Sequence, residues 1–416
     1  MTISISKPQL IIFDQAFVSG INFITGLLLA RALGASGYGL YILCFGFILF
    51  FSTVQVSIVI SQMMITGATL KKEDASKYYL ITRVFQLVSS FAAASIVLIF
   101  GNIALGYLEG WDDQLITPLA LAIFSFLFQD YIRRELFSKD KTLSGLMIDL
   151  TCYGTRIVAL FVLTIDNSLD ISKTLIIIAI SSSISFLYLF DKSILFSRPS
   201  TENWYKASSS HWHNGKWLLL NSLANRLSSQ LVLYATGFIV STAAVGRMGA
   251  TQNIVGFSSI IFQAMENFVP TNAARIYNTG TIHDLNKYLL KIALYGGIIS
   301  LAIVILAGVF AKPLLSLVYS NYTEDSWLIW FWGVYFFLGF FTRPLTAGLR
   351  VLNDTRSIFI ATLFGALFAT IAGIMLIKSF DVTGSMIALC LIQALILLTL
   401  FIKYKRLSTK IINNSL

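Results

Sequence analysis

Apolar stretches of nearly equal length follow one another along the whole chain and are separated by short polar segments. A helix needs about 20 apolar residues to cross the hydrocarbon core of a bilayer, and each stretch is close to that length. We therefore predict about twelve membrane-spanning helices. They cover residues 9–30, 38–61, 79–105, 115–136, 143–165, 172–190, 217–240, 248–271, 288–311, 327–349, 358–377 and 384–402.

The composition agrees with this pattern. Hydrophobic residues make up 56% of the 416 residues and charged residues 12%, which leaves too little polar surface for a soluble domain of this length. The fold class that we predict is an all-α integral membrane protein.

Lysine and arginine are distributed unevenly between alternate loops. With the N-terminus placed in the cytoplasm, most basic residues lie on the cytoplasmic side, and only Arg31, Lys173, Arg247, Lys312 and Lys378 lie outside. This asymmetry orients membrane proteins, so we predict a multi-pass protein with both termini in the cytoplasm. The net charge of +10 then reflects topology and contact with anionic membrane lipids, and we expect no nucleic-acid partner.

The two halves of the chain resemble each other. A polar stripe at residues 14–22 of the first predicted helix recurs 207 positions later, at residues 221–229 of the seventh. Internal repeats of this kind are common in transporters, where two pseudo-repeat halves enclose a central cavity. The predicted parts are an N-terminal six-helix half at 1–190, a polar cytoplasmic linker at 191–216, and a C-terminal six-helix half with a short cytoplasmic tail at 217–416.

Arginine inside a membrane span is costly, about 2.5–3.5 kcal/mol at a helix centre, so it marks a candidate functional residue. Arg156, Arg226 and Arg343 lie well inside predicted spans. The polar residues that share a face with Arg226 on the seventh helix are Asn221, Asn225 and Gln230. A polar face on a membrane helix must meet water, protein or a polar ligand, which predicts that this helix lines the cavity.

Each of these groups has an alternative interpretation. The polar face of the seventh helix could only make interhelical hydrogen bonds, with Arg226 paired to Glu266 or Asp14. Arg156 could belong to a structural polar cluster with Asp149, two turns earlier on the same helix. Asp14 and Glu266 are acids inside spans, and they could exchange a proton or hold a cation during transport.

Other chemistry has little support. Cys44, Cys152 and Cys390 all fall within predicted spans, so neither a disulfide framework nor a cysteine metal site is expected. The pair His211 and His213 lies in the polar linker without further metal ligands nearby. Gly-x-Ser-x-Gly and Walker motifs do not occur. We expect a protein that is not an enzyme and needs no cofactor and no metal.

Several segments resemble one family. Residues 28–41, read as LLARALGASGYGLY, are similar to its first-loop pattern; residues 129–137 with Asp149 are similar to the end of its fourth helix, and residues 269–277 to the end of its eighth. The sequence resembles the polysaccharide and O-antigen flippases (Wzx-type) of the multidrug/oligosaccharidyl-lipid/polysaccharide exporter superfamily. Where that family has Gly-Ala-Ala near the last helix, this chain has Gly384-Ser385-Met386.

The resemblance implies a V-shaped, MATE-like bundle in the bacterial cytoplasmic (inner) membrane. Such a protein moves an undecaprenyl-diphosphate-linked oligosaccharide to the periplasmic leaflet by alternating access, in O-antigen, lipopolysaccharide or other polysaccharide biosynthesis, with a polysaccharide polymerase or glycosyltransferase as partner. A diphosphate needs cations and hydrogen-bond donors inside an apolar protein. The residues to which we assign head-group binding are Arg226, Arg343, Arg156, Asn225, Asn221 and Gln230.

Two other functions stay open. An ion-coupled multidrug exporter shares most of these patterns, and we expect it to have an aromatic, less cationic cavity. A polytopic glycan polymerase generally has a large outer loop, which this sequence lacks.

Overall fold

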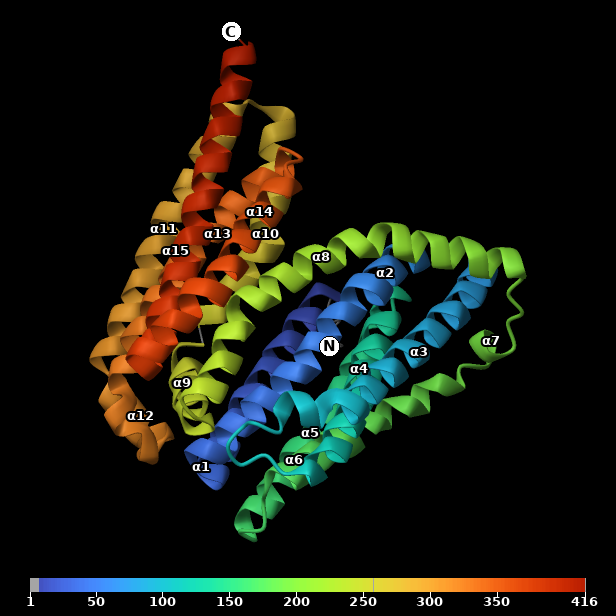
Figure 1. Ribbon diagram of the computed structural model, residues 1–416. Coiled ribbons are helices and arrows are strands. Elements are labelled where there is room, and N and C mark those ends of the chain that lie inside the picture. The colour runs from blue at the N-terminus through green and yellow to red at the C-terminus, as the bar shows by residue number, and fades with distance from the viewer. Residues whose placement is uncertain (1–6, 257, 416) are drawn as a thin grey trace, which may run out of the picture. The chain divides into compact units, whose positions relative to one another are not determined.

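The computed structural model describes residues 7–256 and 258–415, and within them it describes no side chains at 7–9, 11–12, 72, 192–193, 258–268, 318, 320–321 and 414–415. Over these residues the chain is mostly helical and contains no β-strand (Figure 1). It divides into two compact units, unit 1 (Met1–Leu223) and unit 2 (Ala224–Leu416). The predicted all-α class is confirmed.

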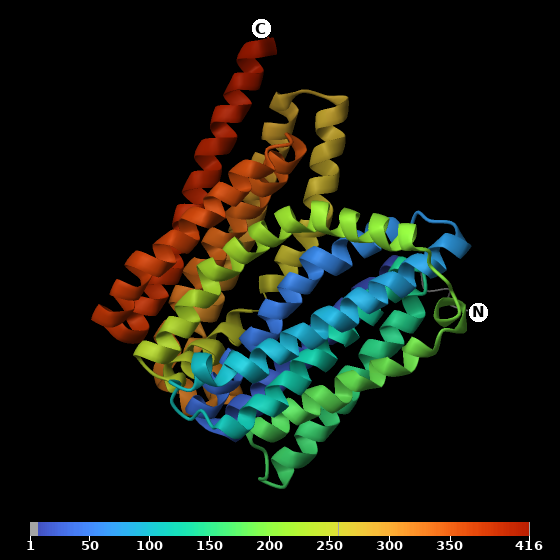
Figure 2. The same cartoon turned by 45° about the vertical axis from the view of Figure 1, so that its right-hand side comes forward.

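Unit 1 consists of helices packed side by side (Figures 1 and 2). They are α1 (Lys7–Gln55), α2 (Ser61–Gly67), α3 (Lys72–Leu105), α4 (Ile116–Ser138), α5 (Thr142–Ile165), α6 (Ile171–Ser183), α7 (Lys192–Leu195) and the first part of α8 (Thr201–Ile239), with short helical turns at Val56–Ile60, Asp113–Leu115 and Ile184–Phe190. Helix α4 packs against α1, α3, α5 and α6, so its side chains form the centre of the unit.

Helix α1 contains two predicted spans. The break between them is at Gly34, whose φ of 68° and ψ of −176° are non-helical. A residue with a Cβ atom rarely adopts a positive φ, which explains a glycine at this position.

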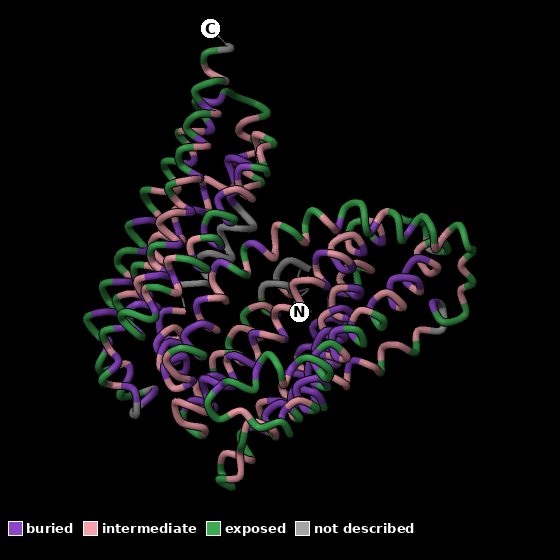
Figure 3. The backbone as a smooth tube through the Cα atoms, in the orientation of Figure 1, coloured by how far each residue is buried: buried purple, intermediate pink, exposed green. Residues whose placement is uncertain are grey.

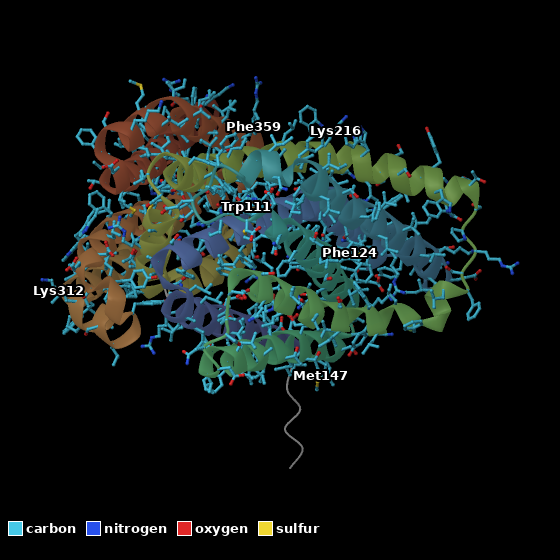
Figure 4. The ribbon with its side chains drawn as sticks, turned by 60° about the horizontal axis from the view of Figure 1, so that its bottom comes forward. Trp111, Phe124, Met147, Lys216, Lys312 and Phe359 are labelled. Carbon is cyan, nitrogen blue, oxygen red and sulfur yellow. The ribbon has the colours of Figure 1, made fainter. Side chains whose placement is uncertain are left out.

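The core of unit 1 joins side chains from α2, α3, α4 and α5. It includes Ile60, Met63, Phe128, Tyr131 and Ile148, all buried. Phe124 of α4, labelled in Figure 4, packs edge-on against Phe186 with 6.0 Å between ring centroids. Exposed residues, green in Figure 3, lie on the helix faces that point away from this core. They include many large apolar side chains, as expected for surfaces that meet lipid.

Unit 2 contains the rest of α8 and seven further helices. They are α9 (Thr242–Val255), α10 (Ser258–Thr279), α11 (Ile282–Val309), α12 (Ala311–Val318), α13 (Leu328–Val351), α14 (Thr355–Phe368) and α15 (Ile374–Ser415), with turns at Ser320–Trp327 and Ala369–Gly373. Helix α13 packs against α9, α10, α11 and α15. Asp381, with a φ of 50°, interrupts α15 between the last two predicted spans.

Within the part of the chain that the structure describes, eight segments are long and apolar enough to cross a membrane. The segments Phe13–Gly67 and Thr355–Asn413 each contain two predicted spans, so the eight account for ten of the twelve. The other two predicted spans, 217–240 and 248–271, coincide with α8, α9 and α10, which are helical but more polar. The structure supports a multi-pass membrane protein, and the count of twelve stays a prediction.

The linker expected at 191–216 is largely helical. It contains α7 and the start of α8, and the boundary between the two units falls after Leu223 rather than within it. The part of α8 before that boundary packs on unit 1. His211 is within hydrogen-bond distance of the Tyr78 hydroxyl on α3, with 2.8 Å between Nε2 and Oη.

Candidate functional site

Two buried acids from different helices lie together in unit 1. Asp14 of α1 and Asp149 of α5 are both fully buried, and α1 packs against α5. Arg133 of α4 donates from Nη1 to Oδ2 of Asp149 over 2.9 Å. The two carboxyl groups are close enough to interact electrostatically. Among the described residues, no group donates a hydrogen bond to either oxygen of Asp14 or to Oδ1 of Asp149.

The charges of this cluster do not balance. The nearby Arg134 is held by Asp130 of the same helix, with 3.0 Å between Nε and Oδ1, so Arg133 is the cation that faces the acid pair. Two ionised carboxylates beside one guanidinium in a buried site are unfavourable. A shared proton supplies the missing donor and removes the excess negative charge, and a bound cation would also remove that charge. The arrangement is therefore suited to bind and release a proton or a small cation.

The sequence identified one member of this cluster. Asp14 was predicted as a coupling residue, and the structure places it beside Asp149, which the sequence associated with Arg156 instead. The other predicted coupling residue is Glu266 of α10. Its side chain lies outside the part of the chain whose side chains the structure describes. Among the described residues no group of three or more His, Cys, Asp or Glu side chains could hold a metal ion.

Arg156 lies inside unit 1 and is 2% exposed. Its Nη2 donates to Ser182 Oγ over 2.9 Å and its Nε to Ser181 Oγ over 3.2 Å. Its guanidinium lies 4.7 Å from the centroid of the Tyr153 ring. These contacts favour the alternative in which Arg156 belongs to a structural polar cluster, although its partners are neutral groups of α4, α5 and α6. A role in head-group binding stays a prediction.

The remaining candidate residues lie on α8 and α13. Arg226, Gln230 and Asn221 are half-buried and Asn225 is exposed, and the unit boundary falls between Asn221 and Asn225. Arg343 is half-buried on α13, which stays helical through Pro344 from Leu328 to Val351. No hinge or unwound segment is present at Pro344. The assignment of these residues to head-group binding stays a prediction.

Comparisons with known proteins identify the fold. No family model matches the chain, and no curated protein matches its sequence. Among solved structures, the inward-facing conformation of a multidrug resistance MATE family transporter of the MOP superfamily superposes with a TM-score of 0.76, at 14% identity over 94% of this chain and 95% of that one. The lipid II flippase MurJ in an inward closed conformation gives a TM-score of 0.71, at 15% identity over 97% and 90%.

A eukaryotic MATE transporter is also similar, with a TM-score of 0.61 at 13% identity over 98% of this chain and 96% of that one. These three neighbours are transporters and a flippase rather than enzymes. At these identities the likeness is one of fold. The chain has the all-α fold of MOP superfamily transporters, as the sequence predicted, and its substrate has to be argued from its own residues.

Proposed function

We propose that this protein is a flippase of the bacterial cytoplasmic membrane. It moves an undecaprenyl-diphosphate-linked oligosaccharide to the periplasmic leaflet by alternating access of its two halves, with both termini in the cytoplasm. Its product would enter O-antigen, lipopolysaccharide or other polysaccharide biosynthesis, where a polymerase or glycosyltransferase is the expected partner.

The observation that carries the proposal is the charge inside the predicted spans of the C-terminal half. These six spans contain a single acid, Glu266, against Arg226, Lys291 and Arg343. Positive charge in a membrane interior is expensive and is kept where an anion needs it. A diphosphate linked to a lipid fits this requirement because its charge needs guanidinium groups while its chain stays in the bilayer. We assign the head group to Arg226 and Arg343, with Asn221, Asn225 and Gln230 as hydrogen-bonding neighbours.

The acid pair in unit 1 supplies the driving force in this proposal. Asp14 and Asp149 take up a proton or a small cation on one side of the membrane and release it on the other. Binding shifts the equilibrium between the two access states only if the cation binds the two states with different affinities. The pair is buried and three of its four carboxyl oxygens accept no hydrogen bond, so a change in access to water would change its proton affinity strongly.

An ion-coupled multidrug exporter is the second candidate. It is favoured by the TM-score of 0.76 with a multidrug resistance MATE family transporter, above the 0.71 with the lipid II flippase. A cationic drug would be repelled by the positive spans of the C-terminal half, which is why we place this function second.

The test uses a strain in which the gene is deleted and replaced by variants. Arg226→Gln/Arg343→Gln should trap the lipid-linked precursor on the cytoplasmic leaflet and lower surface glycan at least tenfold at equal protein level. The control Lys312→Gln/Lys378→Gln also loses two positive charges, at exposed residues outside the predicted spans, and should behave as wild type. Wild-type glycan in the first variant would remove the head-group assignment, and normal glycan with raised drug sensitivity in the deletion strain would establish the exporter.

A further inference from the structure

A groove runs along unit 2 between α11 and α15, with α13 as its floor. Its volume is about 740 Å³. The walls are mostly aliphatic and aromatic, and they include Leu290 and Leu294 of α11, Phe341 of α13, and Ala394 and Phe401 of α15. Leu290 is 60% exposed and Leu294 is 58% exposed. The groove is therefore open along its side, and its exposed apolar walls are of the kind expected on a surface that meets lipid.

One end of the groove is polar and ordered by hydrogen bonds. The Tyr404 hydroxyl donates to Oδ1 of Asn286 over 2.7 Å, and Nδ2 of Asn286 donates to Oγ of Ser408 over 2.9 Å. These bonds connect α11 to α15 across the groove end. Tyr404 also packs on Gly348 of α13, where an added Cβ would lie 2.5 Å from its ring. The end of the groove is thus a fixed polar frame.

This polar end carries positive charge without a balancing acid. Lys405 lines the groove, and a second pocket of about 490 Å³ next to it is lined by Lys405, Arg406, Thr409, Lys410 and Asn413. No aspartate or glutamate is among the described residues that line either pocket. The charge at this end is complementary to a phosphate group.

The length of the apolar part matches one leaflet. Lys405 and Ala394 are eleven residues apart on α15, which at 1.5 Å per residue is about 16 Å. Half of a hydrocarbon core of about 30 Å is about 15 Å. The polar end lies at the start of α11 and at the ends of α13 and α15, which the charge pattern predicts to be cytoplasmic, and the cytoplasmic leaflet is rich in anionic lipids.

We propose that this groove binds an anionic phospholipid of the surrounding bilayer. The phosphate lies against Lys405 and Lys410, and one acyl chain follows α15 from Phe401 to Ala394. A polyprenyl chain is much longer than one leaflet is deep, so most of it would lie outside the groove. This inference goes beyond the proposed function because the lipid is bound and not transported.

The test measures lipid binding to the purified full-length protein by native mass spectrometry. Phosphatidylglycerol with 16-carbon chains should bind more tightly than phosphatidylcholine with the same chains. Lys405→Gln/Lys410→Gln should raise the dissociation constant for phosphatidylglycerol at least tenfold. The control Lys403→Gln/Lys312→Gln loses the same charge at residues that line neither pocket, and it should leave the constant unchanged. An equal loss of phosphatidylglycerol binding in both variants would mean that the lipid is attracted by the overall positive charge and not by this groove, and it would overturn the proposal.

A second variant tests the apolar part. Ala394→Trp fills the groove and leaves the lysines in place, so it should weaken binding of the 16-carbon lipid while phosphatidylglycerol with six-carbon chains binds as before. Short-chain binding also shows that the variant is folded. Unchanged binding of the long-chain lipid would contradict the groove as its site. Displacement of phosphatidylglycerol by a lower concentration of polyprenyl phosphate would make the occupant a polyprenyl lipid and refute our assignment.

Discussion

A buried ion pair between α3 and α4 should contribute strongly to the stability of unit 1. Arg83 donates from Nε and Nη2 to the two carboxylate oxygens of Glu135, each over 2.8 Å, and its Nη1 donates to the carbonyl oxygen of Leu189 over 2.9 Å. The Arg83 side chain is 5% exposed and that of Glu135 is 1% exposed. Arg83→Met keeps an unbranched apolar stem and removes the guanidinium, which leaves the Glu135 carboxylate buried with less compensation.

The size of the effect follows from these contacts. Removing one partner of a buried ion pair costs about 3–5 kcal/mol. Lys139 also contacts Glu135, so we expect a value near the lower limit, about 3 kcal/mol. For a unit of this size that corresponds to a fall in Tm of about 6–12 °C. Arg83→Met/Glu135→Met should recover at least half of this loss, because both charges of the pair are then gone and Lys139 keeps its contact with Asp191.

The assay can report on unit 1 alone. Cys44 and Cys152 are buried in unit 1, so a thiol-reactive fluorophore labels them only after this unit opens. A Cys390→Ala background removes the thiol of unit 2. Lys206→Met, which breaks the solvent-exposed pair with Glu202, is the control and should leave Tm unchanged. A Tm of Arg83→Met within 2 °C of the parent, or a double variant no better than the single one, would refute the reasoning.

Two further predictions use the same assay. His211→Phe removes the contacts of the ring with the Ile58 carbonyl and the Tyr78 hydroxyl and should lower the Tm of unit 1 by several degrees, whereas the exposed His213→Phe should not. Burial lowers the pKa of His211 below its usual 6.5. This residue therefore stabilises the fold fully above pH 6.5 and loses that contribution as the pH falls through the lowered pKa. The difference in Tm between wild type and His211→Phe should shrink toward pH 5, and a constant difference would contradict this. Gly34→Ala should lower the free energy of unfolding by about 1 kcal/mol because the backbone at this residue has a positive φ. Gly20→Ala is the control: an added Cβ there has open space, so the change should be neutral or stabilising. Equal effects of the two variants would contradict the role of the backbone at Gly34.

The sequence predicted most of the helices because each span needs a long apolar run and few other structures can satisfy backbone hydrogen bonds in lipid. It also identified Asp14, since an acid inside a span is costly. It could not find the partners Asp149 and Arg133, which come from α5 and α4. The pairing depends on which helices pack together, and apolar periodicity does not specify that.

The linker was harder to predict for a related reason. Its serines and Pro199 are typical of a loop, yet α8 begins at Thr201 and continues for 39 residues. Tertiary contacts stabilise this helix. Nδ2 of Asn214 donates to Gln62 over 3.0 Å, and an added Cβ at Gly215 would lie 3.0 Å from the Cα of Ile58. Such contacts override local propensity, and they become visible only when α8 is placed against α2 and the turn Val56–Ile60.

The central claim is that a cation bound at Asp14 and Asp149 drives transport of a lipid-linked anion. The most direct measurement reconstitutes the purified protein in liposomes with a fluorescent lipid-linked oligosaccharide diphosphate and follows its transfer between leaflets with and without a gradient of protons or of sodium ions. Our account predicts that wild type transfers the lipid faster with the gradient, and that Asp149→Asn transfers it at least tenfold more slowly and without dependence on the gradient. Gradient-driven uptake of a cationic drug by wild type, with no transfer of the lipid, would contradict the account.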